Sequence, residues 1–176
     1  MKGYASEIKR AMLHLADHED TLFLGQSVAY PGNVIYKNLA DIPDDKKLEL
    51  PVFEATQMGM SIGLALEGVI PISIYPRFNF LLLALDQLEN HLDKLPTFSQ
   101  GGYNPKVIIK TMVGSRNPLH PGAQHCSNYT YEFKHMLNNI HVVDLRDPDI
   151  IFSAYDKALN DNRPTLLIEH GDLYSE

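Results

Sequence analysis

The apolar residues of this chain recur with two spacings that alternate from one segment to the next. Near the amino terminus, Ile8, Met12 and Leu15 follow one another at three- to four-residue intervals, which is typical of an amphipathic helix. Other segments are short runs rich in β-branched residues, which predict strands. On this pattern we expect helices at 5–16, 54–67, 80–95, 131–137 and 150–160, and strands at 21–24, 69–75, 106–111, 141–144 and 165–169.

The alternation of strands and helices predicts an α/β fold. The predicted strands are apolar on both faces, which is typical of parallel strands buried between two layers of helices. A length of 176 residues suits one ordinary domain. We therefore expect a single doubly wound domain over residues 1–176, with a mainly parallel sheet, helices on both faces, and ligands at the carboxyl ends of the strands.

Two long segments, 25–51 and 112–128, show neither spacing and are predicted to be loops. Both are rich in Pro, Gly and Asn, and the first also contains the charged run Asp44-Asp45-Lys46-Lys47. Loops of this length are uncommon in compact domains unless they are functional. Each follows a predicted strand, so each is a candidate to carry part of a site.

The composition narrows the class of protein. A net charge of −7 without clustered Lys and Arg argues against nucleic-acid binding. No apolar stretch approaches the roughly 20 residues that a bilayer demands, and the amino terminus lacks the apolar core of a signal peptide, so we expect a cytoplasmic protein without membrane contact. The single cysteine, Cys126, excludes an internal disulfide and a thiolate-rich metal site, and it is either a nucleophile beside His125 or a small loop residue.

The common phosphate-binding motifs are missing from this sequence. No Gly-x-Gly-x-x-Gly follows the first predicted strand, and no Gly-x-x-x-x-Gly-Lys-Ser/Thr or Gly-x-Ser-x-Gly occurs. The sequence therefore does not indicate a phosphate site of its own.

Glu54 is the first of three places that could carry chemistry. It follows the apolar run 50–53 and opens a helix that contains Met58 and Ile62. Apolar surroundings raise a carboxyl pKa, while a helix amino terminus opposes that rise. On these grounds Glu54 is either an ordinary helix-opening charge or a functional carboxylate.

The other two places are an aromatic cluster and a histidine-containing loop. Residues 75–80 contain Tyr75, Phe78 and Phe80 where a strand ends and a helix begins, and these rings either stack on a planar ligand or belong to the core. In the loop 117–125, His120 and His125 are a weak hint of a metal site. A histidine at the carboxyl edge of a sheet can also transfer protons.

Together these features resemble the pyrimidine-binding domain of transketolase-like thiamine diphosphate enzymes, and most closely that of the beta subunits of the 2-oxo acid (pyruvate or branched-chain) dehydrogenase first component. The resemblance rests on the glutamate-containing helix with its Gly-x-x-x-Gly and Gly-x-x-Pro-Ile rhythm at 53–72, on Phe78-Asn79-Phe80, on Ala84-Leu85-Asp86-Gln87 and on Gly122-Ala123-Gln124-His125, with weaker similarity at 23–29 and 164–169.

The resemblance implies a role for each matching residue. Glu54 would hydrogen-bond a ring nitrogen of the cofactor's aminopyrimidine and so activate the thiazolium carbon. Phe80 would stack on the pyrimidine, and His125 would assist proton transfer or stabilise charge near the substrate. Met58 and Gln26 are further expected cofactor contacts, although relatives often carry an acidic residue where this chain has Gln26.

The resemblance also implies a partner. In the family, a separate domain holds the diphosphate and its magnesium ion, and neither that domain nor the family's carboxyl-terminal domain fits in this chain, so we expect no metal ligands here. We expect a diphosphate-binding, alpha-type partner chain in a heterotetramer or larger assembly, acting by decarboxylation of a 2-oxo acid and transfer of the acyl or aldehyde unit. The alternatives are transketolase-like ketol transfer and a catalytically silent assembly or regulatory subunit.

Overall fold

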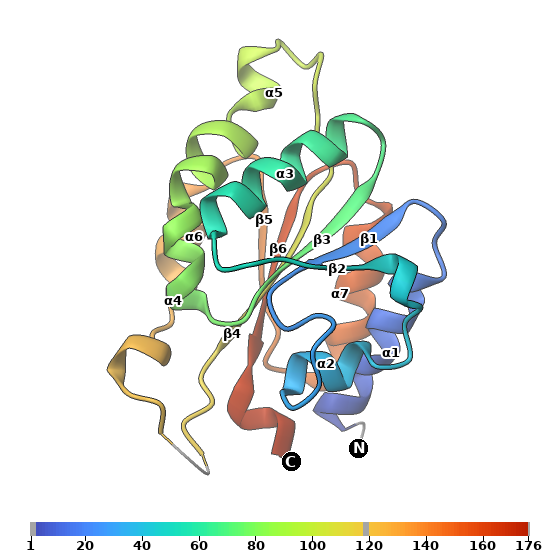
Figure 1. Ribbon diagram of the computed structural model, residues 1–176. Coiled ribbons are helices and arrows are strands. Elements are labelled where there is room, and N and C mark those ends of the chain that lie inside the picture. Colours follow the sequence, from blue (N-terminus) through green and yellow to red (C-terminus); the bar gives the residue numbers. More distant parts are fainter. Residues whose placement is uncertain (1–2, 118–119, 176) are drawn as a thin grey trace.

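A computed structural model describes residues 3–117 and 120–175, so Met1, Lys2, Pro118, Leu119 and Glu176 lie outside the description. Within these ranges the chain forms one parallel sheet with the strand order β2-β1-β3-β4-β6-β5 (Figure 1). The expected doubly wound α/β fold is confirmed. The strands are β1 (Thr21–Gly25), β2 (Lys47–Glu49), β3 (Ile70–Tyr75), β4 (Ile108–Val113), β5 (His141–Asp144) and β6 (Thr165–His170).

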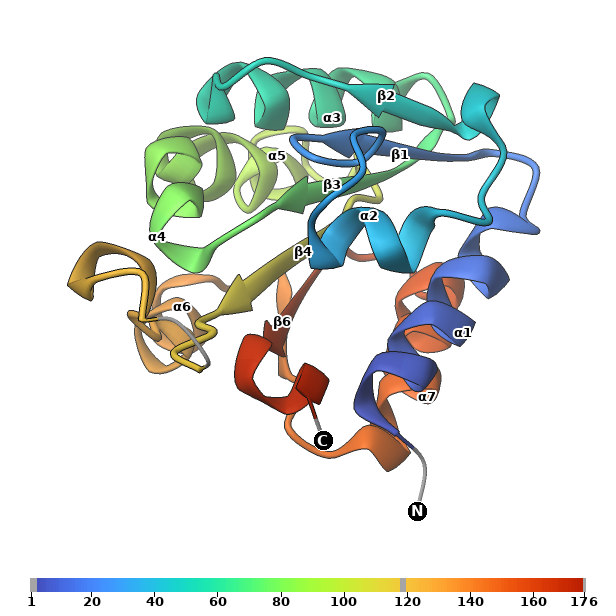
Figure 2. The same ribbon diagram turned by 60° about the horizontal axis from the view of Figure 1, so that its bottom comes forward.

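Helices cover both faces of the sheet, and each face has its own apolar core (Figure 2). The helices are α1 (Tyr4–Ala16), α2 (Val34–Leu39) and α7 (Pro148–Asn160) on one face, and α3 (Glu54–Leu66), α4 (Phe78–Leu81) and α6 (Thr130–Met136) on the other, with α5 (Leu95–Phe98) at one end of the molecule.

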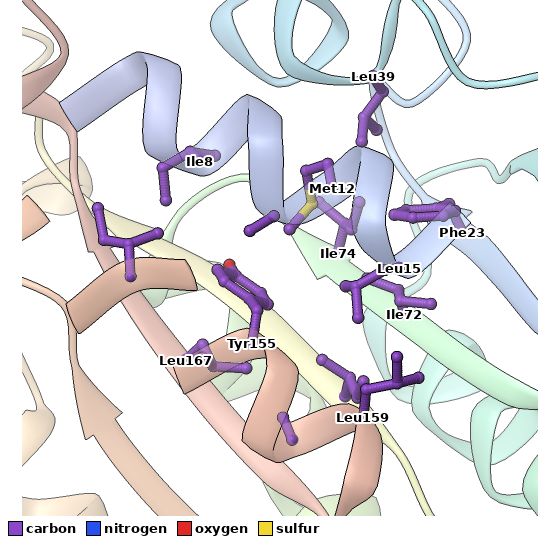
Figure 3. Close-up of a cluster of buried hydrophobic side chains, with 14 of the residues drawn as sticks. Ile8, Met12, Leu15, Phe23, Leu39, Ile72, Ile74, Tyr155, Leu159 and Leu167 are labelled. Atoms are coloured by element: carbon purple, nitrogen blue, oxygen red, sulfur yellow. The ribbon is translucent and has the colours of Figure 1, made fainter. Parts of the chain in front are cut away.

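The two cores follow from the two-residue period of the strands. Leu167 of β6 packs against α1 and α7 in the first core, together with Ile8 and Tyr155 (Figure 3). Its neighbours Leu166 and Ile168 point to the opposite face and enter the second core. The strands carry apolar residues on both faces and are therefore buried on both sides, as the sequence pattern indicates.

The segment 25–51, expected to be loop around little regular structure, contains two short elements, α2 and β2. Helix α2 is only six residues long and is capped by Asn33, whose side-chain oxygen accepts a hydrogen bond from the Tyr36 main-chain nitrogen at 2.8 Å. Strand β2 has three residues and pairs only with β1 among the described strands. Both elements are too short to produce a periodic pattern, although Asn33 is a visible start signal.

The single helix expected at 80–95 is wrong. The segment begins at Phe78 as α4, continues as a 3-10 turn at Leu82–Ala84 and a π-helical turn at Gln87–Leu92, and ends in α5. Pro96 lies in the first turn of α5, where a missing N–H costs nothing. No helix among the described residues combines the length and apolar character needed to cross a bilayer.

The carboxyl end of β1 lies very close to β3. Gly25 pairs with Ile74 and has a φ of +145°, and a Cβ atom at position 25 would lie 2.3 Å from the main-chain oxygen of Ile74. A side chain at this position would therefore both strain the backbone and push the two strands apart.

We expect Gly25→Ala to lower the free energy of unfolding by more than about 2 kcal/mol, because strain and a backbone clash act together. Gly63→Ala is the matched control, since a Cβ at that exposed position of α3 has open space within 4 Å and Ala is the better helix former by about 0.5–1 kcal/mol. Urea unfolding of both variants measures the difference. Equal stability of the two variants would contradict the close approach.

Candidate functional site

The candidate site lies at the carboxyl edge of the sheet, where β1 and β3 are neighbours. The chain leaves β1 toward β2 on one side and later returns to β3 on the other, which makes this the topological switch point where doubly wound folds bind ligands. The structure brings Glu54 next to Gln26, and Phe80 next to His125. Gln26, Glu54, Phe80 and His125 follow β1, β2, β3 and β4 respectively.

Glu54 is a buried carboxylate, 5% exposed, and it is the first residue of α3. The Gln26 side-chain amide donates to its Oε1 at 3.3 Å, and the Tyr75 hydroxyl donates to its main-chain oxygen at 3.3 Å. Burial raises the pKa of Tyr75 well above its ordinary value, and the negative charge of Glu54 raises it further. Glu54 forms no ion pair with any described residue, so its charge rests on an amide and on the helix amino terminus.

Buried hydrogen bonds fix the first turns of α3 on β3. The Gln57 amide nitrogen donates to the Ser73 hydroxyl at 3.1 Å and to the Ile74 main-chain oxygen at 3.0 Å. The Ser61 hydroxyl donates to Ser73 Oγ at 3.0 Å. Gln57, Ser61 and Ser73 are all fully buried, so these contacts set the rotation of α3 about its axis and with it the direction of Glu54.

Glu49 holds the loop that carries Gln26. Its carboxylate accepts hydrogen bonds from the main-chain nitrogens of Ser27, Val28 and Ala29 at 2.7, 2.8 and 2.8 Å. Ser27 has a positive φ of 65°, a conformation that these bonds stabilise. Glu49 is not among the residues predicted from the sequence. The only available signal is an acidic residue at the end of a very short strand beside the switch point.

Phe78 and Phe80 have different surroundings. Phe78 is fully buried and packs edge-on against Tyr129 and Phe133, so it belongs to the core. Phe80 is half-buried, and its ring centroid lies 5.4 Å from that of His125 at an interplanar angle of 73°. Only Phe80 therefore keeps surface for a ligand.

His125 lies in the short 3-10 turn Ala123–His125. Its Nδ1 atom is buried and has no hydrogen-bond partner among the described residues. A buried nitrogen without a partner is costly and needs an explanation, such as a ligand group that completes it. His120 is exposed, and its Nδ1 accepts a hydrogen bond from the Gly122 main-chain nitrogen at 3.0 Å.

The remaining expected residues are Met58 and Cys126. Met58 is fully buried in the second core, so in this arrangement it has no surface to offer a ligand, and its role as a cofactor contact stays a prediction. Cys126 is 4% exposed. Within 3–117 and 120–175, no three His, Cys, Asp or Glu side chains are grouped as a metal site would require.

Comparisons with known proteins place this geometry in a family. The chain is 28% identical over 165 residues to the pyruvate dehydrogenase E1 component subunit beta of Gracilaria tenuistipitata var. liui, covering 92% of this chain and 50% of that protein. It is 30% identical over 155 residues to the chloroplastic subunit beta-3 of Arabidopsis thaliana, covering 86% and 37%. The chain thus spans about half the length, or less, of the curated relatives it matches. No protein-family model matches it.

Solved structures share the fold. A split-gene transketolase, in an inactive beta4 tetramer, superposes with a TM-score of 0.72 at 16% identity, over 96% of this chain and 51% of that one. The transketolase of Campylobacter jejuni subsp. jejuni NCTC 11168 gives 0.73 at 16% identity, over 94% and 25%. The chain is a transketolase-like pyrimidine-binding domain. It is related to the pyruvate dehydrogenase E1 beta subunits.

The family resemblance drawn from residues 53–72, 78–80 and 122–125 is therefore confirmed for this transketolase-like domain. The roles of Glu54, Phe80, His125, Gln26 and Met58 are not tested by the comparisons and stay predictions. The cytoplasmic location also stays a prediction.

We expect Glu49→Ala to release the 27–29 loop, because three main-chain N–H groups lose a charged acceptor. The free energy of unfolding should fall by about 1–3 kcal/mol, and the amides of residues 27–29 should exchange with deuterium much faster. Glu19→Ala, at an exposed position, is the control and should change neither quantity. Unchanged exchange at 27–29 in Glu49→Ala would show that the loop is fixed by other contacts.

Proposed function

We propose that this chain is the pyrimidine-binding, beta-type subunit of a two-chain thiamine diphosphate enzyme that decarboxylates a 2-oxo acid and transfers the acyl or aldehyde unit. The observation that carries the proposal is Glu54, a buried carboxylate at the switch point that forms no ion pair with a described residue. The relationship to proteins named pyruvate dehydrogenase E1 component subunit beta supports the substrate class and the need for another subunit.

The residues fit the aminopyrimidine end of thiamine diphosphate. A ring N–H can donate to the Glu54 carboxylate, because the single amide of Gln26 leaves acceptor capacity on its two oxygens. The half-buried ring of Phe80 offers an aromatic surface, and the unpaired Nδ1 of His125 offers a polar contact. We assign the diphosphate and its magnesium ion to an alpha-type partner chain.

The cofactor would supply an acidic thiazolium carbon and an electron sink. In this proposal Glu54 holds a proton at the pyrimidine nitrogen, and the Gln26 amide, which donates to its carboxylate, keeps that carboxylate in place. Phe80 fixes the plane of the pyrimidine and keeps water from one face of it. His125 gives or takes a proton at the substrate, from a position beside Phe80.

Two other functions use the same fold. Transfer of a ketol unit is the alternative within enzymes, and the similarity to transketolases concerns the fold alone. A catalytically silent subunit is the alternative outside catalysis. The presence together of Glu54, Phe80 and His125 favours an active site, since a subunit without chemistry would have no need to keep all three.

We expect Glu54→Gln to fold and pair with its partner but to lose cofactor activation, because a neutral amide cannot hold the pyrimidine proton. Hydrogen–deuterium exchange at the thiazolium carbon should slow by roughly 10²-fold or more, and turnover should fall with it. Glu67→Gln, at the opposite, exposed end of α3, is the matched control. An unchanged exchange rate in Glu54→Gln would contradict the role of Glu54 in cofactor activation.

We expect Phe80→Ala to weaken binding of thiamine diphosphate by the stacking contribution of about 0.5–1.5 kcal/mol together with the lost burial. Phe98→Ala removes a ring that is 66% exposed in α5 and should leave the affinity unchanged. Calorimetric titration of the assembled enzyme measures both. If the two variants bind equally well, Phe80 is not part of the cofactor site.

A further inference from the structure

His125 lies in the loop that connects β4 to α6. The outgoing limb of this loop begins at Gly114, and the returning limb ends at Cys126. Both limbs are hydrogen-bonded to the segment that carries Phe80. The Arg77 guanidinium makes two of these bonds. Its Nη1 donates to the main-chain oxygen of Gly114 at 2.6 Å and to that of His125 at 3.4 Å. One side chain therefore spans the outgoing and the returning limb.

Arg77 is well placed for this role. It is the residue before α4, two positions after the end of β3, and it is half-buried. Its backbone is held next to Phe80, because the Phe80 main-chain nitrogen donates to the Arg77 oxygen at 3.0 Å. The guanidinium has several N–H groups in a rigid plane, which lets it bond two carbonyl oxygens at once.

Further contacts hold the loop from other directions. Asn79 accepts a hydrogen bond from the Ser127 main-chain nitrogen and donates to the Tyr129 hydroxyl, both at 3.3 Å. Arg116 bonds across the loop to the Cys126 oxygen at 3.3 Å. On the outgoing limb, Asp172 accepts from the Arg116 main-chain nitrogen at 2.7 Å. None of these contacts involves His125 itself, whereas one of the two Arg77 hydrogen bonds does.

We propose that Arg77 is a positioning residue, whose guanidinium ties the two limbs of the 114–125 loop together and thereby sets the ring of His125 against Phe80. The inference rests on the proposed function, in which His125 exchanges a proton with the substrate. Without the guanidinium, the carbonyl groups of Gly114 and His125 lose their shared donor, and the His125 ring loses its fixed distance from Phe80.

The first test is a double-mutant cycle in the assembled enzyme with thiamine diphosphate. Arg77→Met should lower kcat about 10- to 100-fold, the usual cost of misplacing a catalytic group, and Arg77→Lys should recover part of that loss. In a His125→Ala chain, Arg77→Met should cost little more, because both substitutions remove the same contribution. Arg163→Met, at an exposed arginine far along the chain, is the control.

The second test does not depend on activity. The rate at which diethyl pyrocarbonate modifies His125, followed by mass spectrometry, reports how firmly its ring is held. The rate should rise in Arg77→Met, rise less in Arg77→Lys and stay unchanged in Arg163→Met. Thermal unfolding of each variant verifies that the chain is folded.

The outcomes separate the inference from the proposed function. Additive losses of kcat in the cycle, or an unchanged modification rate in Arg77→Met, would overturn the positioning role. If His125→Ala keeps full turnover, His125 has no part in the proposed reaction. The modification rate alone then decides whether Arg77 fixes His125.

Discussion

The carboxyl ends of β1 and β3 approach each other so closely that only a residue without a side chain fits between them. Gly25 faces the main-chain oxygen of Ile74, and the buried amide of Gln57 donates to that same oxygen. The contact between β1 and β3 and the packing of α3 on β3 therefore involve the same main-chain oxygen. Because α3 begins at Glu54, the place of the candidate catalytic carboxylate follows from this contact.

The way buried charges are satisfied distinguishes Glu54 from the others. Lys110 and Glu169 form an ion pair inside the sheet, and Glu169 also accepts a hydrogen bond from Tyr155 at 2.6 Å. Asp93 accepts from three consecutive main-chain nitrogens, at positions 138–140. Glu54 has a single amide as side-chain partner among the described residues. A buried charge with so little compensation is costly, and a ligand that donates a hydrogen bond would offset the cost.

The sequence predicts the long elements well and the short ones poorly. Helices α1 and α7 each bury an apolar stripe long enough to show its period, and α3 buries Met58 and Ile62 one turn apart beside polar residues. The six residues of α2 and the three of β2 are formed by a cap and by pairing with β1, which no period encodes. Glu54, Phe80 and His125 emerge from the family resemblance. Glu49 and Arg77 do not, because each acts on main-chain atoms of a distant segment.

The two halves of the site are held by contacts of different kinds. Glu54 is fixed through fully buried hydrogen bonds between α3 and β3, whereas His125 sits in a loop whose limbs are joined by half-buried and exposed side chains. Segments with few buried contacts open at a lower free energy than the core. The His125 half should therefore open before the Glu54 half, in which Tyr75 hydrogen-bonds the main chain of Glu54.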